Sequence, residues 1–357
     1  MSVDVWAEVD LDAYRANLLR VRSRVAPAEI MVVVKNDAYG HGIRPIVGAA
    51  VAEGVRFVGV LDPGVGIELR ASGLPESVRL FAWLFAADEN YGPAAAARVE
   101  LGVSSVEQLR RIVSTTDGPR RDVLPRIHAK IDTGLGRAGA RAEDWPALVR
   151  AIEAEARAGR VEFVGLWTHI AEASDEEDSV SIAAFERAAL EVAPERRADL
   201  VHHLAASAAS FSRADSRFDL VRVGAFGYGI APGGGVSPAS LGLIPVMSLH
   251  ARVVAVEGEG DDAVAVLPIG TADGLLPGDV EGLEAASGGR RAVVSIGLTE
   301  TLVRDADLRV GDVVTLFGRE DRGEATLQEW ADALGTIGEE IVVRLSSRIE
   351  RRVIDGG

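Results

Sequence analysis

Eight short apolar runs between residues 30 and 223 constrain the fold more than any other feature of the chain. They are rich in Val, Ile and Leu, and stretches with helical spacing, such as residues 43–53 and 145–158, lie between them. Strands that are apolar along their whole length and joined by helices indicate a parallel sheet covered on both faces. About eight such units within roughly 200 residues predict a closed β/α barrel, with a doubly wound open sheet as the alternative. The runs are residues 30–34, 57–60, 78–84, 99–103, 126–131, 161–168, 199–203 and 219–223.

The pattern changes after Tyr228, where the turn-rich segment 231–235 (APGGG) is followed by apolar residues with a period of two. This spacing is typical of strands with one buried face, and it predicts a second, mainly β domain with one helix near residues 327–334. We expect the barrel to span residues 10–232 and the mainly β domain to combine residues 1–9 with 236–357. The alternating runs are residues 246–256, 263–267, 292–296 and 313–317.

Composition excludes several classes of function. The 357 residues include 38 Lys and Arg against 54 Asp and Glu, a net charge of -16, which argues against binding nucleic acid or an anionic membrane. No apolar run approaches the roughly 18 residues that span a bilayer, and the first ten residues lack the features of a secretory signal. Cysteine is absent, which rules out disulfides, thiolate metal sites and a Cys nucleophile, and we expect a cytoplasmic protein. The acidic run 175–178 is expected to be a solvated loop.

Lys35 provides the clearest chemical signal in the barrel segment. It directly follows the apolar run 30–34, so it is expected at the carboxyl end of a barrel strand, where barrel enzymes carry their chemistry. An apolar wall there disfavours the ammonium form, lowers the lysine pKa and favours Schiff-base formation. The alternative is that Lys35 only extends to solvent.

Two other patterns are less specific. Residues 134–139 (GLGRAG) match the G-x-G-x-x-G pattern of dinucleotide-binding folds, but they follow about the fifth strand, and no acidic residue ends the next strand. The six histidines show no spacing typical of metal ligands, so no metal is expected. His169 differs from the others because it directly follows the apolar run 161–168, so it is also expected at the carboxyl end of a barrel strand.

Together these segments resemble the alanine racemase family of pyridoxal-phosphate (PLP) enzymes, and the resemblance extends over nearly the whole chain. It implies a PLP-binding barrel followed by a β domain, a small amino-acid substrate, and a homodimer in which the second domain completes the partner's site. The segments that carry it are residues 6–12, 35–42, 130–137, 165–169, 203–209, 222–224, 267–270 and 345–348.

The resemblance also implies roles for individual residues. Lys35 looks like the Schiff-base lysine and the base on one face of the substrate, and Arg222 looks like the arginine that faces the pyridine nitrogen. Arg137 resembles the arginine that binds the substrate carboxylate, Lys130 the lysine that orients it when carbamylated, and His169 the histidine that couples the second base to Arg222. The residues that look like phosphate contacts are Tyr39, Ser207, Gly224 and Ala225.

The chain departs from the family pattern mainly in its second domain. Thr271 stands where the family has the tyrosine that is the base on the opposite face, and an aliphatic hydroxyl is far less acidic than a phenol. Ile296 and the following Gly297 occupy the place of a substrate-contacting Met-Asp pair. Glu339 replaces a second active-site tyrosine associated with the phosphate, and Ala206 replaces an asparagine.

These departures leave several functions open. The first is alanine racemisation that is weak, or a racemase with another substrate. The second is one-sided chemistry at Cα, as in an epimerase acting through His169, a decarboxylase or an aldolase, and the third is a PLP-binding protein without catalysis. All four tyrosines of the chain precede the turn-rich segment 231–235, so the second domain offers no other phenol to replace the one missing at Thr271.

Overall fold

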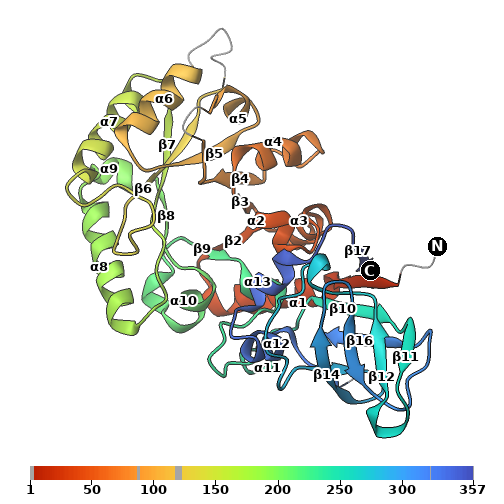
Figure 1. Ribbon diagram of the computed structural model, residues 1–357. Coiled ribbons are helices and arrows are strands. Elements are labelled where there is room, and N and C mark those ends of the chain that lie inside the picture. The colour runs from red at the N-terminus through yellow and green to blue at the C-terminus, as the bar shows by residue number, and fades with distance from the viewer. Residues whose placement is uncertain (1–3, 87–88, 117–122, 322, 357) are drawn as a thin grey trace. The chain divides into compact units, whose positions relative to one another are not determined.

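The computed structural model describes residues 4–86, 89–116, 123–321 and 323–356 (Figure 1). Its first main element is a closed barrel of parallel strands in the order β2 to β9, which confirms the predicted β/α barrel and excludes the open sheet. The strands are β2 (Glu29–Val33), β3 (Phe57–Val60), β4 (Arg79–Ala82), β5 (Val99–Val103), β6 (Arg126–Lys130), β7 (Glu162–Trp167), β8 (Val201–His203) and β9 (Leu220–Val223).

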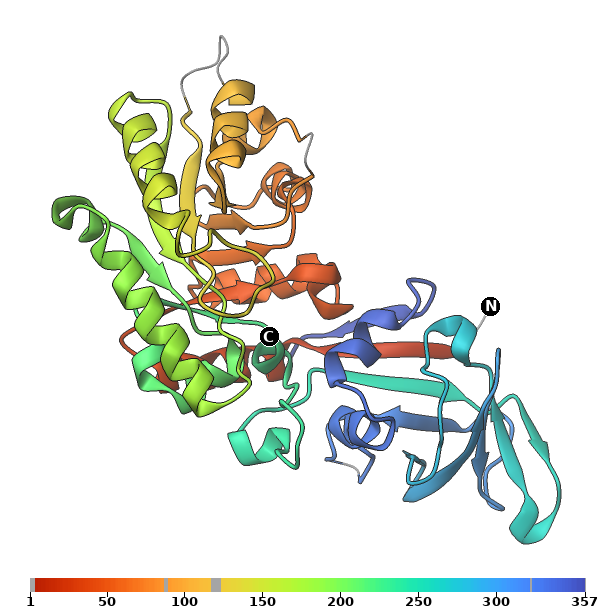
Figure 2. The ribbon, with the colours of Figure 1, turned by 60° about the vertical axis from the view of Figure 1, so that its left-hand side comes forward.

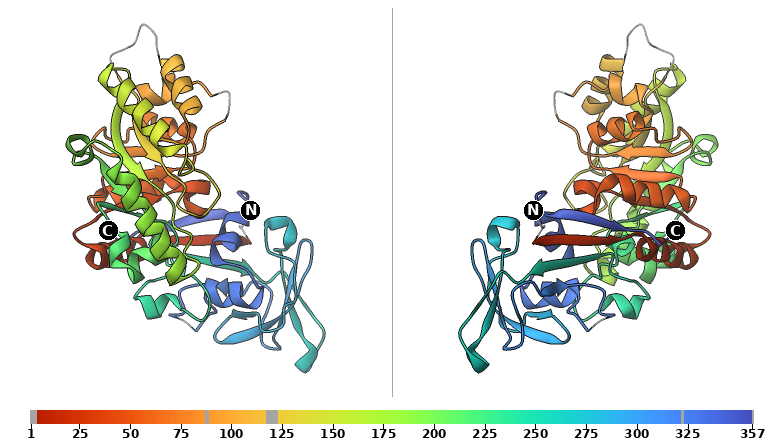
Figure 3. Two further views of the ribbon diagram at one scale, coloured as in Figure 1. Left: turned by 90° about the vertical axis from the view of Figure 1, so that its left-hand side faces the viewer. Right: turned by 90° about the vertical axis from the view of Figure 1, so that its right-hand side faces the viewer.

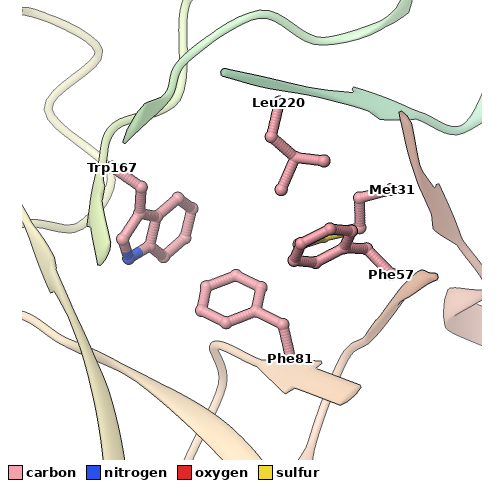
Figure 4. Close-up of a cluster of buried hydrophobic side chains, with 5 residues drawn as sticks. All are labelled: Met31, Phe57, Phe81, Trp167 and Leu220. Carbon is pink, nitrogen blue, oxygen red and sulfur yellow. The ribbon is translucent and has the colours of Figure 1, made fainter. Parts of the chain in front are cut away.

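Large side chains fill the inside of the barrel, as Figure 4 shows. They converge from strands that are far apart in the sequence, and each is at most 7% exposed. Glycines make room for them, because a Cβ added at Gly102 would lie 2.9 Å from the Trp167 ring. The cluster consists of Met31, Phe57, Phe81, Trp167 and Leu220.

Helices lie outside the barrel strands (Figure 1). The longest begins at the acidic run 175–178, so the prediction of a loop there is wrong. The Ser174 hydroxyl accepts the Glu177 N–H as the N-cap, and carboxylates in a first turn are favoured by the helix dipole. The elements are α4 (Pro63–Ala71), α5 (Gly92–Ala96), α6 (Val106–Thr116), α7 (Trp145–Arg157), α8 (Asp175–Leu190), α9 (Pro194–Arg197), α10 (Ser207–Ser212) and η1 (Ala214–Ser216).

The glycine-rich segment 134–139 lies in an irregular connection between β6 and α7. Helix α7 begins only at Trp145, so the glycines do not lead directly into a helix N-terminus. A dinucleotide-binding loop requires that transition, because the helix N-terminus holds the pyrophosphate. The local structure therefore does not support the dinucleotide alternative.

A sheet of nine strands forms the second main element. Figures 2 and 3 show its red strand β1 (Val5–Asp10) between blue β17 (Glu350–Ile354) and green-cyan β10 (Met247–Arg252). β1 pairs in parallel with β17 and antiparallel with β10, so both ends of the chain belong to this sheet. The other strands are β11 (Ala255–Glu257), β12 (Val264–Leu267), β13 (Glu284–Ala286), β14 (Arg290–Ile296), β15 (Thr301–Arg304) and β16 (Val313–Phe317).

Short helices accompany the sheet, and α12 (Leu327–Ala333) occupies the position predicted for a helix. Its N-terminus has a capping box, in which Thr326 and Glu329 each accept the other's backbone N–H. The other short elements are η2 (Ala225–Tyr228), α11 (Pro238–Leu241), η3 (Gly260–Asp262), η4 (Thr271–Asp273) and α13 (Gly338–Arg344).

The chain divides into two compact units. The barrel unit contains residues 21–35 and 51–224, and the sheet unit contains residues 1–20, 36–50 and 225–357. Most of α1 (Leu11–Val25) and of α3 (Ile43–Ala52) therefore groups with the sheet unit. None of the helices within the described ranges combines the length and the apolar character needed to cross a bilayer.

Candidate active site

Five of the predicted site residues come together in the barrel unit. Lys35 follows β2, Lys130 ends β6, His169 follows β7, Arg222 lies in β9, and Arg137 lies in the connection after β6. Burial lowers the pKa of His169 to about 2, and the charges of Arg222, Arg137, Lys130 and Lys35 lower it further. His169 is therefore neutral and surrounded by cations, an arrangement suited to an anionic ligand.

Arg222 is 5% exposed and is held from two sides. Its Nη2 donates to His169 Nδ1 at 2.9 Å and to the Leu204 carbonyl at 2.9 Å, and its Nη1 donates to His203 Nδ1 at 3.2 Å. Burial lowers the pKa of Arg222 to about 9, and nearby Glu172 counteracts part of that effect. Its hydrogen bonds to other described residues all run through Nη1 and Nη2, so its Nε–H is available to a ligand.

Lys130 is 6% exposed and its Nζ lies 4.3 Å from the centroid of the Trp167 ring. Burial lowers the pKa of Lys130 to about 8, and the charges of Arg222 and Arg137 act in the same direction. A substantial fraction of this amine is therefore neutral near pH 8, whereas an ordinary lysine is almost fully charged.

Ser207 and Gly224 meet at the start of α10, where the Gly224 N–H donates to Ser207 Oγ at 3.0 Å. Glu172 lies beside them, because its Oε1 accepts the Ala209 N–H at 2.7 Å. Burial raises the pKa of Glu172. Glu172 cannot be recognised from the sequence, because a single glutamate in a polar loop carries no distinguishing signal.

The sheet unit contains the turn that follows Lys35. Residues 36–39 all adopt left-handed backbone angles, with φ of 53, 52, 54 and 53°. A non-glycine residue in this region costs roughly 1–2 kcal/mol. The turn is held by Asp37, whose Oδ1 accepts the Ile43 N–H at 2.8 Å, and by His41, whose Nδ1 lies 3.0 and 2.9 Å from the carbonyls of Ala38 and Tyr39. This strained turn was not predicted from the sequence, and it fixes the backbone from which the Tyr39 side chain extends.

Tyr39 packs against Tyr228, with ring centroids 4.9 Å apart. Burial raises the pKa of Tyr39, and the negative charge of Glu339 on α13 raises it further. The structure thus brings Tyr39 and Glu339 together within the sheet unit. Ala225 begins η2 in the same unit, and its carbonyl accepts the Ile230 N–H at 3.0 Å.

Thr271 and Ile296 belong to neighbouring segments of the sheet unit. The Thr271 N–H donates to the carbonyl of Gly297, the residue after Ile296, at 2.9 Å. Two glycines permit this close packing: a Cβ at Gly270 would lie 2.5 Å from the Leu298 oxygen, and one at Gly274 would lie 2.0 Å from the Arg344 oxygen. Thr271 therefore has a tightly held backbone.

Three further residues in the barrel were not predicted as part of a site. Glu100, His128 and His203 are at most 1% exposed and connect to Arg222 through hydrogen bonds. Glu100 could have been recognised from the sequence, because a carboxylate in the otherwise apolar strand β5 must have buried polar partners.

Comparison with known proteins assigns the family. Residues 9–232 match the model of the alanine racemase N-terminal domain, and residues 246–353 match that of the alanine racemase C-terminal domain. An alanine racemase of Frankia casuarinae is 38% identical over 374 residues, covering 98% of this chain and 96% of that protein. An alanine racemase of Beutenbergia cavernae is 35% identical and covers 100% of this chain and 99% of that protein.

Solved structures agree with the sequence comparison. The alanine racemase of Streptomyces lavendulae superimposes with a TM-score of 0.91 at 33% identity, covering 100% of this chain and 98% of that one. The enzyme of Streptomyces coelicolor A3(2) also gives a TM-score of 0.91 at 33% identity, covering 99% of each chain.

Proposed function

This chain belongs to the alanine racemase family, and we propose that it is a PLP-dependent racemase that interconverts L- and D-alanine through proton transfer at Cα. The observation that carries this proposal is the group of cations around neutral His169 in the barrel. PLP and an amino-acid substrate supply a phosphate and a carboxylate, the anions that such a group favours.

The lysine content of the chain supports the same function. Among 38 basic residues only two are lysines, Lys35 and Lys130, and both lie at the carboxyl end of a barrel strand. Arginine supplies the positive charge elsewhere, but a guanidinium serves poorly as a nucleophile or a carbamate-forming amine. Lysine is thus retained where an amine that can lose its proton is useful.

The residues of the barrel fit PLP. The Nε–H of Arg222, which the hydrogen bonds to described residues leave unused, is a donor suited to the pyridine nitrogen, and a guanidinium there would leave that nitrogen unprotonated. Bound PLP would act as an electron sink for the pair of electrons left at Cα when a proton is removed. Lys35 would hold the cofactor and move the proton on one face, while Arg137, oriented by Lys130, would bind the substrate carboxylate.

Other residues are proposed to hold the phosphate. Ser207 would contribute a hydroxyl, Gly224 a backbone N–H that turns from Ser207 Oγ to the phosphate, and Ala225 a second N–H. Tyr39 would add a phenol, with Glu339 beside it as an opposing charge. Ile296 is proposed to contact the substrate near Thr271.

Cofactor attachment tests this assignment directly. The purified protein incubated with PLP should gain a visible absorption band, and borohydride should then attach the cofactor to Lys35, as peptide mass spectrometry would show. Lys130→Arg is the matched control, since it removes the other lysine and should leave labelling at Lys35 intact. A protein that stays colourless and unlabelled contradicts the proposal.

Thr271 favours a second candidate, in which proton exchange occurs on one face only. Racemisation requires a base on each face, and the loss of one general base typically costs about 10² to 10⁴ in rate. Deuterium exchange at Cα without formation of the other enantiomer would support one-sided chemistry. Rapid formation of both enantiomers would refute it, and no exchange with any amino acid would indicate a PLP-binding protein without catalysis.

Assembly and location are also proposals. We infer a homodimer in which residues 1–9 and 236–357 of one subunit complete the site of the barrel, residues 10–232, of its partner. Mixing a Lys35→Ala protein with a variant altered only in the second domain, such as Thr271→Asp, should then restore one intact site per dimer. Sedimentation would test the dimer itself, and cell fractionation would test the expected cytoplasmic location.

A further inference from the structure

A continuous chain of hydrogen bonds runs inside the barrel from Arg222 to Glu100. Arg222 Nη1 lies 3.2 Å from His203 Nδ1, and His203 Nε2 lies 3.1 Å from His128 Nδ1. His128 Nε2 lies 2.7 Å from Glu100 Oε2. The four residues come from β9, β8, β6 and β5, and none is more than 5% exposed.

The two ends of this chain allow only one arrangement of its protons. Arginine can only donate hydrogen bonds, so His203 Nδ1 must accept from Arg222. An ionised carboxylate can only accept, so His128 Nε2 must donate to Glu100. With both imidazoles neutral, the remaining proton lies on His203 Nε2 and is donated to His128 Nδ1. Every bond then has one donor and one acceptor, and both rings have their proton on Nε2.

Packing prevents either imidazole from turning away. The His203 ring stacks on Trp167, with ring centroids 5.6 Å apart and an angle of 6° between the planes. The centroid of the Phe81 ring lies 5.3 Å from that of His203 and 4.7 Å from that of His128. Figure 4 shows Phe81 and Trp167 inside the barrel. A Cβ at Gly165 would lie 2.1 Å from His128 Nδ1, so glycine on β7 makes the space for this ring.

Glu100 is anchored as an anion. Arg79 donates to it through Nε and Nη2 at 2.6 and 2.7 Å, and Arg126 Nη1 lies 2.7 Å from its Oε1. Burial alone would raise the pKa of Glu100, but hydrogen bonds from His128 and Arg79 outweigh it and lower the pKa to about 2. The two arginines already neutralise the charge of Glu100, so its hydrogen bond to His128 is not needed for charge pairing. Its effect is to fix which nitrogen of His128 carries the proton.

We propose that Glu100 is a positioning residue for Arg222, acting through the tautomers of His128 and His203. Its carboxylate holds both imidazoles with a lone pair on Nδ1, so that His203 always offers an acceptor to Arg222 Nη1. The guanidinium is thereby held with Nη1 and Nη2 engaged and Nε–H left for a ligand. The role of that Nε–H toward the cofactor rests on the proposed function, whereas the tautomers do not.

Nitrogen-15 NMR of the cofactor-free protein tests the tautomers, since the chain has only six histidines. In wild type, His128 and His203 should both be protonated on Nε2 and bare on Nδ1. In Arg222→Met, where Glu100 is the only remaining end group, both should keep this tautomer. In the double variant that combines Arg222→Met with Glu100→Gln, His128 and His203 should no longer prefer the Nε2 tautomer. A His203 that changes tautomer in Arg222→Met alone overturns the proposal.

PLP binding tests the consequence for Arg222. Glu100→Gln should weaken PLP affinity about tenfold, the effect of losing one hydrogen bond to a charged group. Arg126→Gln is the matched control, because it removes an ion pair from Glu100 but leaves the bond to His128, and PLP affinity should change less than about twofold. If Glu100→Gln does not fold, Gly165→Ala interrupts the chain at His128 and should weaken PLP binding similarly.

The outcomes separate this inference from the proposed function. If wild-type protein fails to bind PLP but has His128 and His203 both protonated on Nε2, the proposed function is contradicted and the inference about the tautomers is supported. Wild-type protein that binds PLP, with Glu100→Gln and Gly165→Ala binding equally well, overturns the positioning role. Equal weakening by Arg126→Gln would also overturn it, because it would show a general effect of the ion pair.

Discussion

Arg222 Nη2 donates a hydrogen bond to His169 Nδ1 over 2.9 Å. The Nδ1 lone pair is therefore occupied, and neutral His169 carries its proton on Nε2, where it is a donor. Burial and neighbouring cations lower its pKa to about 2. His169 is thus a weak base at neutral pH, and this argues against an epimerase that uses His169 in place of the missing tyrosine.

The first prediction concerns Thr271. Thr271→Tyr should raise the rate of alanine racemisation by about 10² to 10⁴, because it restores a phenol as the second base. The tightly held backbone of this segment favours a defined position for the new side chain. Measurement of both enantiomers in deuterium oxide checks the result, with Thr271→Phe as a control for ring size. Equal rates for the Tyr and Phe variants would show that the missing phenol is not the defect.

Glu339 should oppose binding of the cofactor phosphate if Tyr39 contacts that phosphate. Glu339→Gln removes a negative charge close to Tyr39 and should tighten PLP binding about three- to fivefold. Glu340→Gln, an equal charge change at an exposed position of the same helix, should have a smaller effect. A fluorescence titration with PLP distinguishes the two variants. Equal effects would mean that only net charge matters.

Lys130 should form a carbamate with dissolved carbon dioxide at mildly alkaline pH. Its pKa is lowered to about 8, so the fraction of reactive neutral amine increases as pH rises through 8 instead of through 10.5. Carbon-13 NMR with labelled bicarbonate should show a carbamate signal that Lys130→Gln abolishes and Lys35→Ala retains. Absence of the signal at pH 8.5 would leave Lys130 acting only through its charge.

Buried histidines should make the barrel sensitive to acid. His128, His169 and His203 have pKa values lowered chiefly by burial, so below pH 6.5 the unfolded chain binds protons that the folded barrel does not. The free energy of unfolding should therefore fall as pH decreases from 6.5 to 5.5, by about 1 kcal/mol from His169 alone, and His128 and His203 should contribute in the same direction. Urea unfolding of the cofactor-free protein measures this. A constant free energy across that interval would contradict the prediction.

Two glycine substitutions should have opposite effects on stability. Gly102→Ala places a Cβ 2.9 Å from the Trp167 ring and should destabilise the barrel by about 1–3 kcal/mol. Gly48→Ala, at an open and exposed position of α3, should stabilise by about 0.5–1 kcal/mol through helix propensity. Thermal unfolding compares the two variants, and a Gly102→Ala protein as stable as wild type would show that the ring shifts freely.

Local pattern was enough to predict the barrel, its strands and the position of Lys35. Strands such as 57–60 and 99–103 were predicted at the observed residues because a continuous apolar run is a property of neighbouring residues. The run 175–178 was wrongly predicted as a loop, because Ser174 acts as an N-cap only when the following turn packs as a helix. The left-handed turn at residues 36–39 was also missed, since nearby polar groups and tertiary packing impose it against local preference.

Local patterns along the chain are thus enough to predict the order of elements, the residues at the strand ends and the family to which they point. The hydrogen bonds that link Glu100, His128, His203 and Arg222, in contrast, are visible only in the three-dimensional structure. These residues lie up to 122 positions apart, from 100 to 222, and closure of the barrel is what brings their inward-facing side chains together. Their residue types were visible in the sequence, but a hydrogen bond depends on distance and direction in space, which the order of residues does not specify.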